Sequence, residues 1–105
     1  MRSAIPRTGA WCAGLALAAT VAVPVAAQDV QARAWAASCA ACHGTDGRST
    51  GAVPPLAGRP KADLLRAMQD FKSDKRSATI MHQHAKGYTD AELERIADYF
   101  SKVSR

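Results

Sequence analysis

The stretch Cys39-Ala40-Ala41-Cys42-His43 decides the fold of this chain. Two thiols three residues apart lie on one side of a helical turn, and the histidine that follows presents its imidazole from the adjacent position. This spacing suits two covalent bonds to one porphyrin and a nitrogen ligand to its iron, and Cys-x-x-Cys-His is the attachment signal of c-type haem. The motif therefore predicts one covalent haem c with its iron, held by Cys39 and Cys42 and ligated by His43.

Other uses of a Cys-x-x-Cys pair fit this sequence less well. A dithiol redox pair needs a thioredoxin-like strand and helix, and no strand is predicted here. A structural zinc ion needs four ligands, but the segment after the leader has no second cysteine pair, and His82 and His84 are closer together than zinc-binding histidines usually are. A disulfide between Cys39 and Cys42 would be strained. Haem remains the favoured interpretation.

The N-terminus has the composition of an export signal. Arg2 and Arg7 precede an apolar run over residues 10–23, and Val25-Ala26-Ala27 offers the small residues that a signal peptidase recognises. The run is shorter than the roughly 20 residues that span a bilayer. We predict a cleaved signal peptide over residues 1–27 and a single haem domain over residues 28–105, located in the periplasm without stable membrane insertion.

The domain that remains is small for an independent fold. A chain of this size buries only about 60% of the surface that it exposes when unfolded, and it needs a cofactor or another staple for stability. We therefore expect the haem to form much of the core.

The fold class predicted is all-α, with three main helices around the haem and no strand. The first helix is expected over residues 30–41, with a face of small side chains that lets another helix approach closely. That face consists of Val30, Ala34, Ala37 and Ala41.

The second and third helices have clearer signals. Pro60 favours a helix start before residues 61–72, where Leu64, Met68 and Phe71 share one face. Thr89 and Glu92 form the pattern of a capping box at the start of the third helix. The third helix continues to about residue 103 and is expected to cross the first through Ile96 and Phe100. The segments 44–59 and 73–88 are predicted to be irregular loops.

Residue chemistry alone does not decide which side chain is the second axial ligand of the iron. Met68, Met81, His82 and His84 are candidates, and an iron without a second protein ligand is a further alternative. Met68 belongs to an apolar helix face, where methionine usually packs. Thioether ligation favours reduced iron and raises its potential, which suits an electron carrier and favours Met81. An open site would instead indicate a haem enzyme or a gas-binding haem protein.

The charge distribution along the chain indicates which classes of partner it could bind. The chain has a formal net charge of +5. Between Gly47 and Lys86 the sequence has eight basic residues and only three acidic ones, Asp63, Asp70 and Asp74. This excess gives either a solvated basic surface or a docking face for an acidic redox protein. Nucleic acid is not expected as a partner, because the basic residues lack interleaved aromatics and the predicted compartment is wrong. The eight basic residues are Arg48, Arg59, Lys61, Arg66, Lys72, Lys75, Arg76 and Lys86.

These motifs together resemble the class I cytochromes c, in the short bacterial periplasmic form with His/Met iron. The resemblance covers residues 39–47 with the haem motif, the segment Pro54-Pro55-Leu56-Ala57-Gly58, the helix at 64–76 and the pair Ile80-Met81. It implies that Met81 is the second iron ligand. It also implies that the Pro54 carbonyl accepts a hydrogen bond from the second ring nitrogen of His43, which fixes the imidazole.

The stretch Met81-His82-Gln83-His84-Ala85-Lys86-Gly87-Tyr88 is similar to the cytochrome subunit of flavocytochrome c sulfide dehydrogenase. This resemblance implies that the chain is a non-catalytic electron carrier that takes electrons from a flavoprotein subunit. Several subunits of that family contain two haem domains, whereas this sequence has one Cys-x-x-Cys-His motif. A free electron carrier therefore remains the alternative to a complex subunit.

Overall fold

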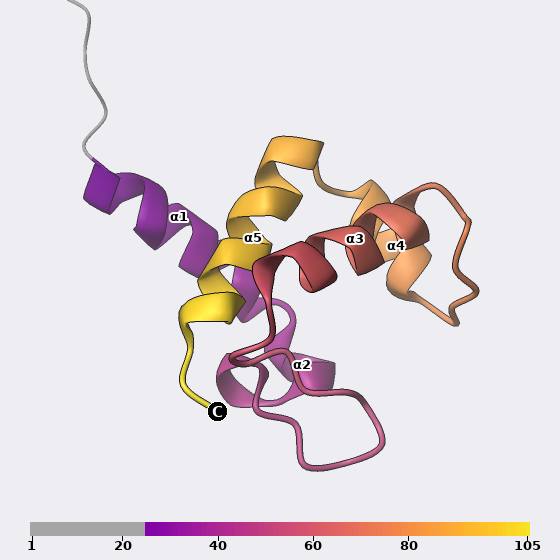
Figure 1. The fold of residues 1–105 in the computed structure, drawn as a ribbon, viewed down its shortest axis with the longest axis horizontal. Coiled ribbons are helices and arrows are strands. Elements are labelled where there is room, and N and C mark those ends of the chain that lie inside the picture. The colour runs from indigo at the N-terminus through magenta and orange to yellow at the C-terminus, as the bar shows by residue number, and fades with distance from the viewer. Residues whose placement is uncertain (1–24) are drawn as a thin grey trace, which may run out of the picture.

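The computed structural model describes residues 25–105, and every regular element in that range is helical (Figure 1). The all-α prediction is confirmed. The elements are α1 (Val25–Ala37), α2 (Ala40–His43), the 3₁₀ turn η1 (Thr45–Gly47), α3 (Lys61–Lys72), α4 (Met81–Lys86) and α5 (Asp90–Lys102).

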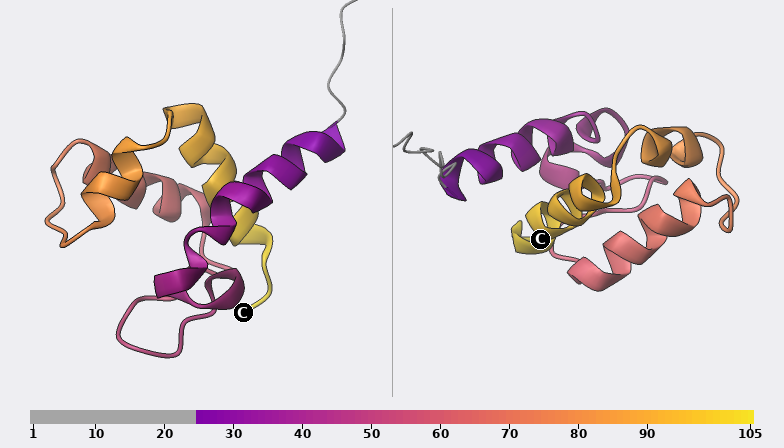
Figure 2. Two further views of the ribbon diagram at one scale, coloured as in Figure 1. Left: turned by 180° about the vertical axis from the view of Figure 1, so that it is seen from behind. Right: turned by 90° about the horizontal axis from the view of Figure 1, so that it is seen from above.

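The predicted crossing of the first and last helices is present. α1 runs across α5 in Figure 1 and in the view from behind in Figure 2. Ala36 is 3% exposed and belongs to one buried cluster with Ile96, Ala97 and Phe100. A methyl group at position 36 keeps the two backbones close, so the larger side chains of α5 fill the space beside α1.

The face of α1 that makes this crossing differs from the prediction. Ala32 and Ala36 are buried, and Trp35 and Cys39 pack partly buried against the same core. These positions follow the i, i+3, i+4, i+7 pattern of a helix face. The predicted face was wrong because it lies on another side of the helix, and because a turn at Ser38 and Cys39 puts the last member on α2. Its members Val30, Ala34, Ala37 and Ala41 are exposed.

The predictions for α3 and α5 are confirmed. α3 covers Lys61–Lys72, with Pro60 directly before it and Leu64 buried. At the start of α5, Glu92 N–H donates to Thr89 Oγ1 at 3.3 Å, and Thr89 N–H donates to Glu92 Oε2 at 2.8 Å. This reciprocal pair is the capping box, which satisfies backbone donors that a helix start would otherwise leave free.

The helix α4 was missed, because residues 73–88 were expected to be a loop. Its six residues have no side-chain cap, and a helix that short is not stable by propensity alone. Tertiary contacts hold it against α3. Ala85 is 0% exposed, and Lys72 Nζ on α3 donates to the Tyr88 carbonyl just beyond α4 at 2.8 Å.

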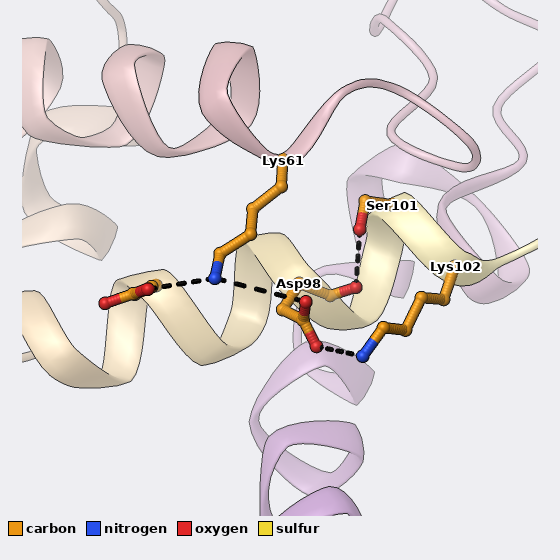
Figure 3. A network of polar contacts seen from close by, with 5 residues as sticks. Lys61, Asp98, Ser101 and Lys102 are labelled. Atoms are coloured by element: carbon orange, nitrogen blue, oxygen red, sulfur yellow. Dashed lines mark hydrogen bonds and ion pairs between the residues drawn. The ribbon is translucent and has the colours of Figure 1, made fainter.

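An ion-pair network joins the start of α3 to α5 (Figure 3). Lys61 Nζ lies 2.9 Å from Glu94 Oε1 and 4.0 Å from Asp98 Oδ1. Asp98 also pairs with Lys102 one turn further along α5. These exposed contacts link the start of α3 to α5 where the chain leaves the loop that follows the haem motif.

No helix within residues 25–105 is long and apolar enough to cross a bilayer. Residues 1–24, which include most of the predicted signal peptide, lie outside the described range. The remaining three residues of that segment, 25–27, form the beginning of α1.

Candidate haem-binding site

The Cys-x-x-Cys-His motif begins directly after the end of α1. The Ser38 hydroxyl donates to the Trp35 carbonyl at 2.8 Å and satisfies one of the last acceptors of that helix. The chain then turns, and α2 starts with Cys39 at its N-cap position. His43 N–H donates to the Cys39 carbonyl at 2.9 Å, so one helical turn carries both sulfurs and the imidazole.

The two thiols differ in their surroundings. Cys39 is half-buried against the core shared by α1 and α5, whereas Cys42 is exposed, and neither forms a disulfide. Burial raises the pKa of the Cys39 thiol. Two free thiols on one turn satisfy the geometry that attachment to a single porphyrin requires.

His43 is buried, with 7% of its surface exposed. Its Nδ1 lies 2.7 Å from the Pro54 carbonyl oxygen. A carbonyl only accepts, so the proton of the neutral ring is on Nδ1, which leaves the Nε2 lone pair for a metal. A backbone partner of this kind fixes the orientation of a ligating imidazole. The residues present therefore fit a c-type haem.

The loop that supplies the Pro54 carbonyl is anchored to the turn after the motif. Leu56 N–H and Ala57 N–H both donate to the Gly47 carbonyl, at 2.8 and 3.1 Å, and Gly58 N–H donates to the Phe100 carbonyl at 2.9 Å. Gly47 has φ +73°, and a Cβ there would lie 2.9 Å from both the Leu56 Cβ and the Phe100 Cε1. A glycine is required at this position to bring the loop, the turn and α5 together.

A second anchor was missed at the sequence level. Tyr99 OH donates to Asp46 Oδ1 at 3.1 Å, and Arg48 lies 3.2 Å from the other oxygen of Asp46. Arg48 Nε also donates to the Ser104 carbonyl at 2.9 Å. Tyr99 and Ser104 lie more than fifty residues from Asp46 and Arg48, so no local signal pointed to these contacts.

Met81 is the first residue of α4 and is partly buried, beside Ile80, which is 50% exposed. Figure 1 shows α4 beside α3, with the segment 73–80 looping out between them. The packing of α4 on α3 therefore determines where the Met81 thioether lies.

The other ligand candidates occupy different positions. Met68 is partly buried on α3, His82 is partly buried on α4, and His84 is exposed. Among residues 25–105, no three His, Cys, Asp or Glu side chains gather where they could hold a metal ion.

Ion pairs alter the basic face expected from the sequence. Lys72 lies 2.8 Å from Asp90, and Lys86 lies 2.7 Å from Asp74, so both are partly neutralised. Arg48, Lys61 and Arg66 also have carboxylate partners. In the part of the chain that the structure describes, the basic residues of segment 47–86 without an ion pair are Arg59, Lys75 and Arg76. Arg76 stacks over the Phe71 ring at 5.0 Å.

The family model for cytochrome c matches residues 27–104. The chain belongs to the cytochrome c family. As a cytochrome c it carries a covalently bound haem c with iron. Its single Cys-x-x-Cys-His motif corresponds to one haem.

The relatives of this cytochrome c are named as cytochromes or as an electron acceptor. The cytochrome subunit of sulfide dehydrogenase from Chlorobaculum tepidum is 46% identical over 68 residues, which are 65% of this chain and 62% of that protein. Cytochrome c4 from Pseudomonas aeruginosa is 41% identical over 70 residues, covering 66% of this chain and 35% of that protein. The thiosulfate dehydrogenase electron acceptor of Thiomonas intermedia is 37% identical over 70 residues, or 65% of this chain and 32% of that protein.

A solved structure shares the fold. Cytochrome c4 of Acidithiobacillus ferrooxidans superposes with a TM-score of 0.68 at 29% identity, covering 73% of this chain and 51% of that protein. The chain thus spans less than two thirds of the length of each of these relatives. None of these comparisons favours the alternative of a haem enzyme or gas-binding protein.

Proposed function

We propose that this cytochrome c holds its haem through thioether bonds from Cys39 and Cys42, with His43 and Met81 as the axial ligands of the iron. When bound, the haem supplies a one-electron couple between ferrous and ferric iron. The observation that carries the proposal is the 2.7 Å contact between His43 Nδ1 and the Pro54 carbonyl. It leaves Nε2 as the metal-binding atom and strengthens its donation.

Met81 is favoured as the second ligand over its neighbours. A thioether raises the reduction potential relative to a second imidazole, which suits a carrier that accepts electrons. Burial also favours Met81 over His84, which is exposed, while His82 is partly buried like Met81, so the choice between those two rests on the thioether.

The visible spectrum of the holoprotein tests this ligand set. The oxidised protein should have the methionine–iron charge-transfer band near the red end of the spectrum, and the reduced protein should not bind carbon monoxide readily. Met81→Ala should remove the band and allow carbon monoxide to bind, whereas Met68→Leu and His82→Ala should keep the wild-type spectrum. If His82→Ala removed the second ligand and Met81→Ala did not, the assignment would be wrong.

We further propose that the chain is the electron-accepting subunit of a sulfide-oxidising flavoenzyme. The support is the 46% identity with the Chlorobaculum tepidum cytochrome subunit of sulfide dehydrogenase. A partner that oxidises sulfide would deliver electrons one at a time to the haem, and no substrate chemistry is required of this chain. A free carrier is the second candidate, because other relatives are named cytochrome c4 and an electron acceptor.

Co-purification separates the two candidates. Affinity capture from native extract should bring down a flavin-containing protein in a fixed ratio to the haem, and sulfide should then reduce the haem of the captured complex. A haem protein that elutes alone and is not reduced by sulfide after mixing with its own extract would support the free carrier.

Export to the periplasm completes the proposal. It rests on the charged, then apolar N-terminus and on the small residues ahead of position 28. Mass spectrometry of the exported holoprotein should give a chain that begins at Gln28. A chain that retains residues 1–27 would contradict the predicted cleavage.

A further inference from the structure

Asp74 adopts a backbone conformation that residues other than glycine seldom take. It directly follows the C-cap of α3 and has φ +59°, in the left-handed region. The chain wraps around the helix end there, and Lys75 N–H and Arg76 N–H both donate to the Asp70 carbonyl, at 2.9 and 3.1 Å. Glycine is the usual residue at such a position, because a Cβ makes the conformation strained. Aspartate is one of the few other residues that tolerate this conformation, and the carboxylate of Asp74 has a partner of its own.

The carboxylate of Asp74 binds the far end of α4. Lys86 Nζ donates to Asp74 Oδ1 at 2.8 Å and to Oδ2 at 2.7 Å, and this bond lowers the pKa of Asp74. Lys86 is the last residue of α4. The ion pair therefore closes the segment 74–86 into a loop, and Met81 lies inside that loop.

Other contacts leave this segment loosely held. Within residues 25–105, no hydrogen bond ties Ser77, Ala78 or Thr79 to another residue. Ser77, Thr79 and Ile80 are exposed. α4 is thus held at its C-terminal end, where Ala85 is buried and Lys86 is paired, while residues 77–79 ahead of Met81 have no hydrogen bond within the described chain to hold them.

We propose that Asp74 and Lys86 are positioning residues for the Met81 thioether. Their ion pair holds α4 against the end of α3 and keeps Met81 from leaving the iron. The inference rests on the proposed role of Met81 as an axial ligand. Both partners are well exposed, with side-chain exposures of 41% for Lys86 and 63% for Asp74, so the pair adds little to global stability. Its effect is local, on how readily Met81 is displaced.

Imidazole titration of the oxidised holoprotein measures that effect, with the methionine–iron charge-transfer band as the signal. Asp74→Gly removes the carboxylate and relieves the backbone strain at once. Its thermal unfolding midpoint should stay equal to the wild-type value or rise, while imidazole displaces the methionine roughly two- to fivefold more readily. If Asp74 had a merely structural role, Asp74→Gly would lower the unfolding midpoint as imidazole binding increased.

Further variants isolate the ion pair. Asp74→Asn keeps a side chain that tolerates the left-handed conformation and should increase imidazole binding as Lys86→Gln does. The double variant Asp74→Asn, Lys86→Gln should add nothing beyond either single change. Glu94→Gln is the matched control, since it breaks the ion pair between α3 and α5 without touching segment 74–86, and it should leave imidazole binding unchanged.

The outcomes separate this inference from the proposed function. A wild-type protein without the charge-transfer band would overturn the Met81 assignment and the inference with it. A normal band combined with unchanged imidazole binding in Asp74→Gly, Asp74→Asn and Lys86→Gln would overturn the inference alone. Equal increases in all variants, Glu94→Gln included, would also overturn it, because the effect would then not belong to this pair.

Discussion

At the scale of single residues, Tyr99 and Asp46 connect α5 to the turn that follows the haem motif. The phenol donates to the carboxylate at 3.1 Å. Burial, and then the hydrogen bond to Asp46, raise the pKa of Tyr99 above its ordinary value. The protonated phenol is therefore the form that the fold stabilises.

Tyr99→Phe should lower the free energy of unfolding by about 1 kcal/mol at neutral pH, the usual worth of one such hydrogen bond. Because the pKa of Tyr99 is raised in the folded state, this contribution is fully present below the unfolded-state value near 10 and is lost as the pH rises through the folded-state value. Denaturant unfolding of wild type and variant at a series of pH values should give curves that converge above pH ~10.

The control is Tyr88→Phe, because the hydroxyl of Tyr88 lies 3.3 Å from Ser38 Oγ in an exposed contact. This control should lower the free energy of unfolding less than Tyr99→Phe does at neutral pH. A Tyr99→Phe protein as stable as wild type from neutral to alkaline pH would contradict a stabilising role for the bond to Asp46.

The residues of the haem motif could be predicted from the sequence, because covalent attachment imposes a fixed local spacing. The bond between His43 Nδ1 and the Pro54 carbonyl was expected only through the resemblance to class I cytochromes c, and the structure contains it at 2.7 Å. Asp46, Tyr99 and Arg48 could not be predicted, since contacts across more than fifty residues of chain depend on the finished fold. The left-handed Asp74 gave no signal in the sequence either.

At the scale of elements, α5 has the strongest local start signal in the chain. Thr89→Ala removes the side-chain acceptor for Glu92 N–H and should lower the free energy of unfolding by about 1 kcal/mol. Chemical denaturation of the holoprotein measures the difference. The haem spectrum should stay unchanged, because α5 still packs through Leu93, Ile96 and Phe100.

Thr79→Ala serves as the matched change in an exposed residue without a hydrogen bond to the described chain. It should leave stability unaltered within error. If both threonine variants had wild-type stability, the capping box would not contribute as proposed.

The elements also show where sequence patterns are informative. α3 and α5 carry an apolar periodicity and a start signal each, and their bounds were predicted closely. α1 was predicted with the wrong buried face, because alanine is so frequent there that several faces look alike. α4 was missed because it is held by tertiary contacts, among them the burial of Ala85 and the bond from Lys72 to the Tyr88 carbonyl.

At the scale of the whole molecule, the buried apolar core formed by the described chain is small. Five of its nine buried hydrophobic residues are alanines, and Leu93 is the one large side chain among residues 25–105 that is fully buried. A core of this kind supplies little hydrophobic free energy. The haem must therefore contribute much of the stability of the fold.

A protein that cannot attach haem should consequently fail to fold. Cys39→Ser combined with Cys42→Ser, produced without haem supply, should have low helix content by circular dichroism and no cooperative thermal transition. The holoprotein should unfold cooperatively under the same conditions. A cooperative transition in the haem-free variant near the holoprotein midpoint would show that the polypeptide core suffices.

The unpaired positive charges of the described chain indicate where the proposed redox partner would dock. Lys75 and Arg76 are exposed and have no carboxylate partner in the described chain, so they remain available to an acidic surface. Lys75→Glu should slow electron transfer from the partner and weaken its dependence on ionic strength. Stopped-flow reduction at several salt concentrations measures both effects.

Arg66→Glu is the matched control, because it makes the same charge change on an exposed residue of α3 that already pairs weakly with Asp63 at 3.9 Å. Equal effects of Lys75→Glu and Arg66→Glu would indicate a response to net charge alone and would contradict a docking face at the end of α3.

The crowding at Gly47 sets how this sequence can vary. In a library of all single substitutions, selected for red holoprotein, position 47 should tolerate no side chain, because even a methyl group would meet Leu56 and Phe100 at 2.9 Å. Gly51, where a Cβ would meet nothing within 4 Å, lies four residues away and should accept many replacements. Two glycines four residues apart are thus under opposite steric constraints: neighbouring side chains exclude a Cβ at Gly47, and open space allows one at Gly51.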